Sequence, residues 1–174
     1  MWMLRWIGHD NVAVLDGGFA KWVNEGRETT LDVPLFTPLN YPIKPRNDLA
    51  VDVRSVEKML GKSLLLDARA PARYRGEQEP IDPVAGRIPG AKNRFNMDNV
   101  SAKGVFKDKD TLRKDFAAVL GNRAPSEVIH YCGSGVAACH NLLAMEIAGL
   151  KGGKLYAGSW SEWSADQKRP QERG

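Results

Sequence analysis

Short apolar runs alternate with helix-like segments over most of this chain. The runs at 63–67, 127–131 and 154–156 have the length and composition of buried strands. The segments at 55–60, 71–74, 111–120 and 136–150 have helical patterns or residues that start helices. This alternation predicts an α/β fold, in which helices cover both faces of a parallel sheet. Ligands bind such sheets at the carboxyl ends of the strands.

The chain also repeats a short pattern. Residues 1–22 align without gaps with residues 142–163. Leu15, Gly17, Phe19 and Trp22 fall on Tyr156, Gly158, Trp160 and Trp163. Each copy reads as a helix, a short strand, a glycine turn and a second helix, so residues 12–15 are expected to form a buried strand. Chance similarity between two common strand–turn–helix units is the alternative.

The repeat predicts a domain organisation, because only the second copy has a long region upstream of it. We expect the end of a first domain at 1–28, a linker at 29–46 and a complete second domain at 47–174. On this reading the chain begins inside the first domain, as a truncation, a fragment or a natural start. An incomplete first domain would expose an apolar surface and favour self-association, with Trp2, Trp6, Phe19 and Trp22 on that surface.

Composition narrows the classes of function. The 25 basic and 21 acidic residues give a net charge of +4, without a dense basic block. We therefore expect no nucleic-acid partner. No apolar run approaches the length of a membrane span, and Arg5 and His9 interrupt the first nine residues, so a cytoplasmic location without membrane contact is expected. Two cysteines and three scattered histidines predict neither a disulfide framework nor a metal site.

Cys132 stands between a predicted strand and a predicted helix. The loop that follows it consists of Gly133, Ser134, Gly135, Val136 and Ala137. The glycines permit a tight turn that presents successive N–H groups, and the helix adds the positive end of its dipole. This environment is expected to lower the pKa of the thiol and to stabilise a thiolate or persulfide. A buried cysteine in a tight turn is the alternative.

Cys139 lies seven residues further on, inside the predicted helix. A helical stripe is formed there by Val136, Cys139, Leu143, Ile147 and Leu150. The stripe predicts that Cys139 belongs to the core. A role as a resolving cysteine is the alternative.

Four segments resemble the rhodanese superfamily. They are the loop at 132–141 and the segments at 156–163, 67–76 and 88–93. More narrowly, they resemble the catalytic domain of mercaptopyruvate and thiosulfate sulfurtransferases, over nearly all of 47–168. The resemblance implies a reaction without a cofactor. The Cys132 thiolate takes a sulfur atom from an anionic donor, and the persulfide passes it to cyanide or a thiol acceptor.

The resemblance also implies roles for individual residues. Arg73 falls on the position that binds the anionic group of the donor, although a surface salt bridge is the alternative. Arg75 is a second, less supported substrate-binding candidate, and Arg69 is expected to be structural. Asp67 is expected either to support the Cys132 loop or to act as a structural cap.

The loop chemistry bears on the donor. Gly133 and Ser134 stand where thiosulfate-preferring members place basic residues, so the loop resembles the mercaptopyruvate type. Ser134 falls on a serine that handles protons in that type, or it is simply small enough for the loop. Arg87 replaces a usual histidine, and Asp82 lies near the position of a second substrate arginine. The family's active site also uses the first domain, whose acid–base partners for the serine are not found in this sequence.

Two rival functions remain at this point. A cysteine phosphatase needs an arginine six residues after the cysteine, where this chain has Ala138. A non-enzymatic module, such as a sulfur carrier, an interaction domain or an inactive fragment, is the other alternative. Formation of a persulfide on Cys132 would separate these functions.

Overall fold

A computed structural model describes residues 1–174. Its centre is a five-stranded sheet in the order β1-β5-β4-β2-β3, and all neighbouring strands are parallel. The strands are β1 (Ala50–Val51), β2 (Leu64–Asp67), β3 (Lys92–Asn93), β4 (Val128–Tyr131) and β5 (Lys154–Tyr156). The predicted α/β fold with a parallel sheet is confirmed.

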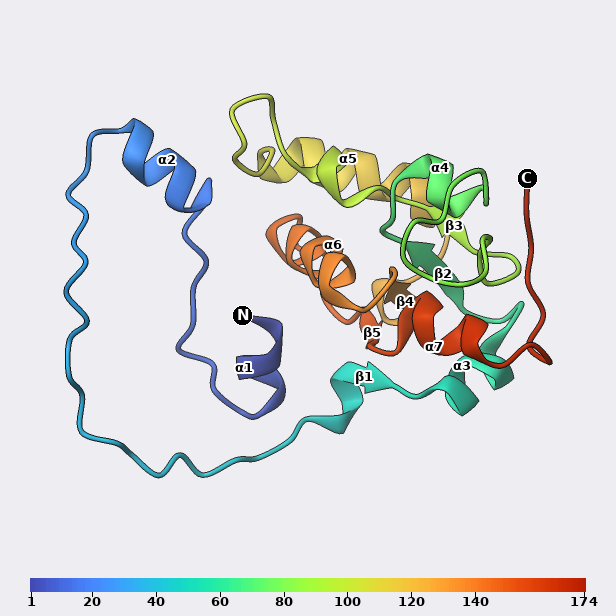
Figure 1. The fold of residues 1–174 in the computed structure, drawn as a ribbon. Coiled ribbons are helices and arrows are strands. Elements are labelled where there is room, and N and C mark those ends of the chain that lie inside the picture. Colours follow the sequence, from blue (N-terminus) through green and yellow to red (C-terminus); the bar gives the residue numbers. More distant parts are fainter.

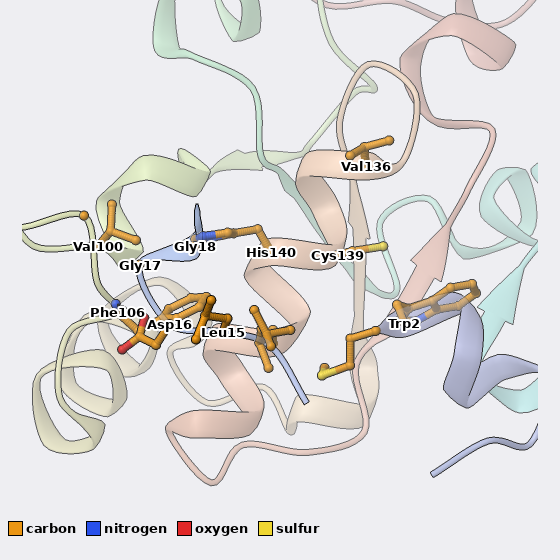
Figure 2. Close-up of a pocket in the computed structure, with 14 residues that line it drawn as sticks. Trp2, Leu15, Asp16, Gly17, Gly18, Val100, Phe106, Val136, Cys139 and His140 are labelled. Atoms are coloured by element: carbon orange, nitrogen blue, oxygen red, sulfur yellow. Dashed lines mark hydrogen bonds between the residues drawn. The ribbon is translucent and has the colours of Figure 1, made fainter. Parts of the chain in front are cut away.

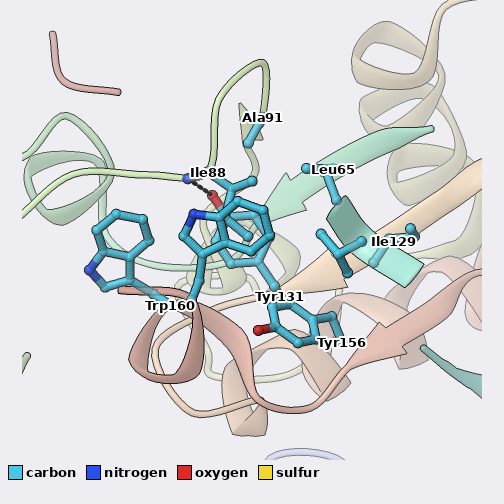
Figure 3. Close-up of a cluster of buried hydrophobic side chains, with 9 residues drawn as sticks. Leu65, Ile88, Ala91, Ile129, Tyr131, Tyr156 and Trp160 are labelled. Carbon is cyan, nitrogen blue, oxygen red and sulfur yellow. Dashed lines mark hydrogen bonds between the residues drawn. The ribbon is translucent and has the colours of Figure 1, made fainter. Parts of the chain in front are cut away.

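Helices cover both faces of the sheet (Figure 1). Alternate side chains of β2 and β4 point to opposite faces. Leu65 and Ile129 pack with the helices α3 (Val53–Met59) and α7 (Ser159–Ala165), around buried Trp160 (Figure 3). Leu64 and Leu66 pack on the other face, against α5 (Lys109–Leu120) and α6 (Val136–Ile147).

Local sequence explains where these helices begin. Asp52 caps α3 by accepting a hydrogen bond from the Ser55 N–H, and Asp108 caps α5 through the N–H groups of two residues of its first turn. Leu112 and Phe116 recur at helical spacing and are fully buried. The shorter elements are α4 (Pro71–Tyr74) and the 3₁₀ turns η1 (Asn47–Leu49), η2 (Asn96–Asn99) and η3 (Pro125–Glu127).

The first part of the chain contains two short helices, α1 (Trp2–Trp6) and α2 (Gly18–Asn24). The bounds of α2 and α7 differ by 141 residues at both ends (159 − 18 and 165 − 24), and α1 and α6 end at the same separation (147 − 6). The predicted strand at 12–15 is wrong: those residues form no strand, and Leu15 is 56% exposed. A strand needs a neighbouring strand, and this segment pairs with no strand of the sheet.

The N-terminal region lies along α6 (Figure 1). Arg5 pairs with Glu146 of α6, and Trp2 packs against the buried cluster that contains Cys132. Residues 27–46 then run without a helix or strand to the sheet. Phe19 is 70% exposed, and the predicted self-association through this region stays a prediction. None of the helices combines the length and apolar character that a membrane span requires.

Candidate active site

Cys132 lies at the carboxyl end of β4 and is 3% exposed. The loop after it turns at Gly135, whose φ of +82° is a conformation that favours glycine. A Cβ at Gly135 would lie 2.7 Å from the carbonyl oxygen of Ala157. A side chain there would therefore push the loop away from the segment that connects β5 to α7.

The start of α7 fixes this loop by three hydrogen bonds. The Cys132 N–H donates to Ser159 Oγ at 3.1 Å, the Trp160 N–H donates to the Cys132 carbonyl at 3.0 Å, and the Ser161 N–H donates to the Gly133 carbonyl at 2.9 Å. Of the two expectations for Asp67, the structure favours the structural one, because its carboxylate accepts hydrogen bonds from Arg69 and none from the Cys132 loop. The support comes from residues that are distant in sequence.

The loop leaves hydrogen-bond donors free. The backbone N–H groups of Gly133, Ser134 and Gly135 donate to no other group of the protein. Ser134 is exposed and makes no side-chain hydrogen bond. Unpaired N–H groups that follow a cysteine and precede a helix form a cradle for negative charge.

A cavity of about 530 Å³ opens in front of the loop. It brings together several predicted site residues, namely Cys132, Gly133, Ser134, Val136, Ala137 and Arg73. Gly135 is buried and does not line this cavity. The walls also include residues that sequence reasoning missed, among them Phe95, His140 and Ser161.

Arg73 lies beside the loop at Gly133, the residue that follows Cys132. A Cβ at Gly133 would stand 3.4 Å from Arg73 Nη2, so the missing side chain lets the guanidinium lie close to the backbone. The same Nη2 donates to Glu79 at 2.5 Å and to Asp82 at 3.3 Å. Although burial opposes ionisation, the hydrogen bond from Arg73 holds the pKa of Glu79 below its usual value.

Arg69 is an almost fully buried residue of the cavity wall. It is 3% exposed, and its Nη2 donates at 2.7 Å both to Asp67 and to the carbonyl of Gly86. Its Nη1 donates to Glu79 at 3.1 Å. Arg69 and Arg73 therefore share the carboxylate of Glu79.

Two other arginines lie away from the cavity. Arg75 is an exposed residue that pairs with Glu77, so the structure does not bring this substrate-binding candidate to Cys132. Arg87 is buried, pairs with Glu172 and stacks over the ring of Tyr74. Arg87 thus ties the C-terminal segment to the domain and does not line the cavity.

His140 joins the cavity to the turn η2. Its Nδ1 lies 3.2 Å from the side-chain amide of Asn99, and its ring stacks on Phe106 with centroids 4.6 Å apart. Burial lowers the pKa of His140. The position of His140, one helical turn after Val136, was a signal that it shares the loop's face of the helix.

Cys139 occupies a different environment from Cys132. A second cavity, of about 400 Å³, separates α6 from the N-terminal segment, with Trp2, Leu15 and Cys139 among its walls (Figure 2). The prediction that Cys139 belongs to the core is confirmed in part: Cys139 is half-buried and packs against the buried cluster that contains Cys132, whereas Val136, at the start of the stripe, is 77% exposed. Burial raises the pKa of the Cys139 thiol to about 11, and its Sγ donates to the Gly135 carbonyl at 3.4 Å.

Comparison with known proteins agrees with this geometry. The sequence model of a protein family, the rhodanese-like domain, matches residues 52–166. The chain belongs to the rhodanese family. A relative, a probable 3-mercaptopyruvate sulfurtransferase of Pseudomonas aeruginosa, is 45% identical over 99% of this chain and 62% of its own length. A sulfur carrier protein of Thermus thermophilus is 33% identical over 93% of this chain and 61% of its own length.

Solved structures of other proteins share this fold. An anaerobic ergothioneine biosynthesis enzyme from Chlorobium limicola, in complex with trimethyl histidine, superposes with a TM-score of 0.88. Its sequence is 27% identical, and the match covers 99% of this chain and 44% of that enzyme. This rhodanese chain spans about 60% of the length of the curated relatives that it matches.

Proposed function

We propose that the protein is a sulfurtransferase that carries sulfur as a persulfide on Cys132. The observation that carries the proposal is the position of Cys132 at the carboxyl end of β4, between three unpaired N–H groups and the guanidinium of Arg73. The N–H groups suit a thiolate and a terminal persulfide anion. The guanidinium suits the anionic end of a sulfur donor.

The reaction has two displacements. The Cys132 thiolate attacks the sulfur of 3-mercaptopyruvate, an S–S bond forms, and the C–S bond breaks as the enolate of pyruvate leaves. A proton converts the enolate to pyruvate, and we assign its delivery to Ser134; the position of Ser134 in the wall of the cavity supports this role. With thiosulfate the same attack releases sulfite and needs no proton. Cyanide or a thiolate then attacks the outer sulfur and returns Cys132 to its thiolate.

The remaining loop residues have supporting roles in this proposal. Gly133 lets Arg73 approach, and Gly135 lets the loop turn against Ala157. Val136 and Ala137 line the cavity and begin the helix behind the cysteine. Arg75, which pairs with Glu77 away from the cavity, has no part in the proposed binding of the donor.

We also propose that the rhodanese unit at 47–174 holds the catalytic chemistry, and that 29–46 is a linker. For residues 1–28 we propose that they are the C-terminal end of a first, non-catalytic rhodanese-like domain. This proposal is supported by the constant offset of 141 residues between α2 and α7. Left-handed φ angles of 62° at Gly18 and 56° at Ser159 recur at the same offset.

A sulfur carrier is the second candidate function. It is favoured by the Thermus thermophilus relative, whose name is that of a sulfur carrier protein. A carrier would hold the persulfide on Cys132 and pass it only to a partner protein. Both functions need the same loaded cysteine, and turnover with a small acceptor distinguishes them.

The test is an intact-mass measurement after incubation with 3-mercaptopyruvate and, separately, with thiosulfate. We expect a gain of one sulfur atom, which cyanide removes as thiocyanate. Cys132→Ser should abolish the gain, because a hydroxyl neither attacks nor holds the sulfur. Cys139→Ser is the matched control and should load normally, since Cys139 remains a thiol at neutral pH. Loading that persists in Cys132→Ser but disappears in Cys139→Ser would overturn the assignment.

A further inference from the structure

The donor cavity carries an unusual balance of charge. Its wall and the contacts behind it contain two arginines, Arg69 and Arg73, and three carboxylates, Asp67, Glu79 and Asp82. The sum is one net negative charge (2 − 3), without counting the Cys132 thiolate. A cavity that only had to attract anions would not place more carboxylates than guanidinium groups around its cation.

The carboxylates occupy most of Arg73. Its Nε donates to Glu79 at 3.2 Å, and its Nη2 donates to Glu79 and to Asp82. Only Nη1 has no partner in the protein. The guanidinium therefore offers one free nitrogen to a donor rather than the two-nitrogen fork that grips a dianion.

Asp82 is held in place from a second side. The Ser161 hydroxyl, on α7, donates to Asp82 Oδ1 at 2.6 Å. The side chains of Asp82 and Glu79 are only 6% and 3% exposed, so water screens their charges poorly. Their charges act on whatever binds between Arg73 and Cys132.

We propose that Asp82 and Glu79 are specificity-determining residues, which make the site prefer a donor with one negative charge over a dianion. The inference rests on the proposed function, and it concerns the donor that loads Cys132. A monoanionic carboxylate satisfies the free Nη1 of Arg73. A dianion such as thiosulfate brings an extra charge that the two carboxylates repel.

The test compares the rates at which thiosulfate and 3-mercaptopyruvate load Cys132 in Asp82→Asn, followed by intact mass. The asparagine keeps an oxygen for the Ser161 hydroxyl and removes only the charge. We expect the thiosulfate to 3-mercaptopyruvate rate ratio to rise about fivefold to tenfold, the size of one charge interaction across a partly screened site. Glu79→Gln is the second variant and should shift the ratio in the same direction.

Asp48→Asn is the matched control for the removal of one charge. Asp48 is exposed and precedes the amino end of the edge strand β1, whereas Cys132 follows the carboxyl end of the central, parallel strand β4. Asp48 makes no side-chain hydrogen bond or ion pair. Its variant should leave the ratio unchanged. An equal rise in Asp48→Asn, or no rise in either carboxylate variant, would overturn the inference.

A second measurement keeps this inference separate from the proposed function. The alkylation rates of Cys132 with anionic iodoacetate and with neutral iodoacetamide, resolved from Cys139 by peptide mapping, report the local charge without any sulfur transfer. The ratio of the iodoacetate rate to the iodoacetamide rate should rise about threefold or more in Asp82→Asn. If neither donor loads any variant but this ratio rises, the proposed function fails and the electrostatic inference stands. If loading occurs and both ratios are unchanged, only the inference fails.

Discussion

The segments that end in α2 and α7 have the same pattern and different surroundings. Both helices begin with a left-handed residue, at Gly18 and Ser159, and both carry a tryptophan whose indole N–H donates to a carbonyl further along the chain. Before α7 lies β5, which pairs with β1 and β4. Before α2 lies a segment without a strand.

The difference shows which parts of the strand–turn–helix pattern are determined by residues close in sequence. The helix bounds and the left-handed first residue recur without a sheet, because backbone conformation at a helix start is set over a few residues. The strand does not recur, because its backbone groups need partners on a neighbouring strand. The same pattern therefore specifies its helices without help from the rest of the fold, whereas its strand forms only where a neighbouring strand pairs with it.

The tryptophans give the largest expected contrast between the two segments. Trp163 is fully buried in the core, and Trp22 is only partly covered. We expect Trp163→Ala to lower the free energy of unfolding by about 3–5 kcal/mol, because it leaves a large cavity. Trp22→Ala should cost less than about 1 kcal/mol. Urea unfolding of both variants measures the contrast, and equal losses would show that the N-terminal segment is as well packed as the sheet.

The sequence predicted the parts of the molecule that local pattern controls. The alternation of apolar runs and helices predicted the sheet, and the Cys132 loop predicted a cradle at its edge. Contacts between distant residues were not predictable in this way. Ser159 supports Cys132 across 27 residues of sequence, and Asp82 meets Ser161 only because the loop after α4 folds over α7. The failed strand at 12–15 has the same cause, since composition cannot supply a pairing partner.

The pH dependence of stability provides a second contrast, because the sheet unit buries His130 completely. Burial lowers the pKa of His130 to about 3, below the ordinary value of 6.5. Between about pH 3 and pH 6.5, His130 therefore binds a proton in the unfolded chain and not in the folded chain. The stabilising effect is fully present above about pH 6.5, and it falls by up to about 1.4 kcal/mol per pH unit as the pH decreases toward 3.

Denaturant unfolding between pH 7 and pH 5 would measure this loss, in a window above the titration of most carboxylates. His130→Leu is the informative variant, because His130 Nδ1 has no hydrogen-bond partner and an apolar side chain leaves nothing unsatisfied there. The variant should flatten the pH dependence, with a smaller part remaining from His140, whose pKa is also lowered. An unchanged slope in His130→Leu would place the acid sensitivity elsewhere, including the N-terminal segment.

The smallest expected effect comes from making the first residue of α7 like that of α2. Ser159→Gly removes the hydroxyl that accepts from the Cys132 N–H and donates to the Tyr156 carbonyl. It also relieves a left-handed conformation that glycine adopts freely. These effects oppose each other, so the free energy of unfolding should fall by only about 1 kcal/mol.

The functional consequence of Ser159→Gly should exceed its effect on stability. Without the hydroxyl, the Cys132 N–H loses its partner and the loop is held by the backbone bonds of Trp160 and Ser161 alone. We expect slower persulfide loading of Cys132, measured by intact mass. Gly18→Ala is the matched control. Its Cβ would meet open space, but the backbone φ of 62° is strained for alanine. The variant should lose about 1 kcal/mol of unfolding free energy and load Cys132 at the normal rate. Normal loading in Ser159→Gly would mean that the Ser159 hydroxyl, which distinguishes the start of α7 from that of α2, does not support the Cys132 loop in its function.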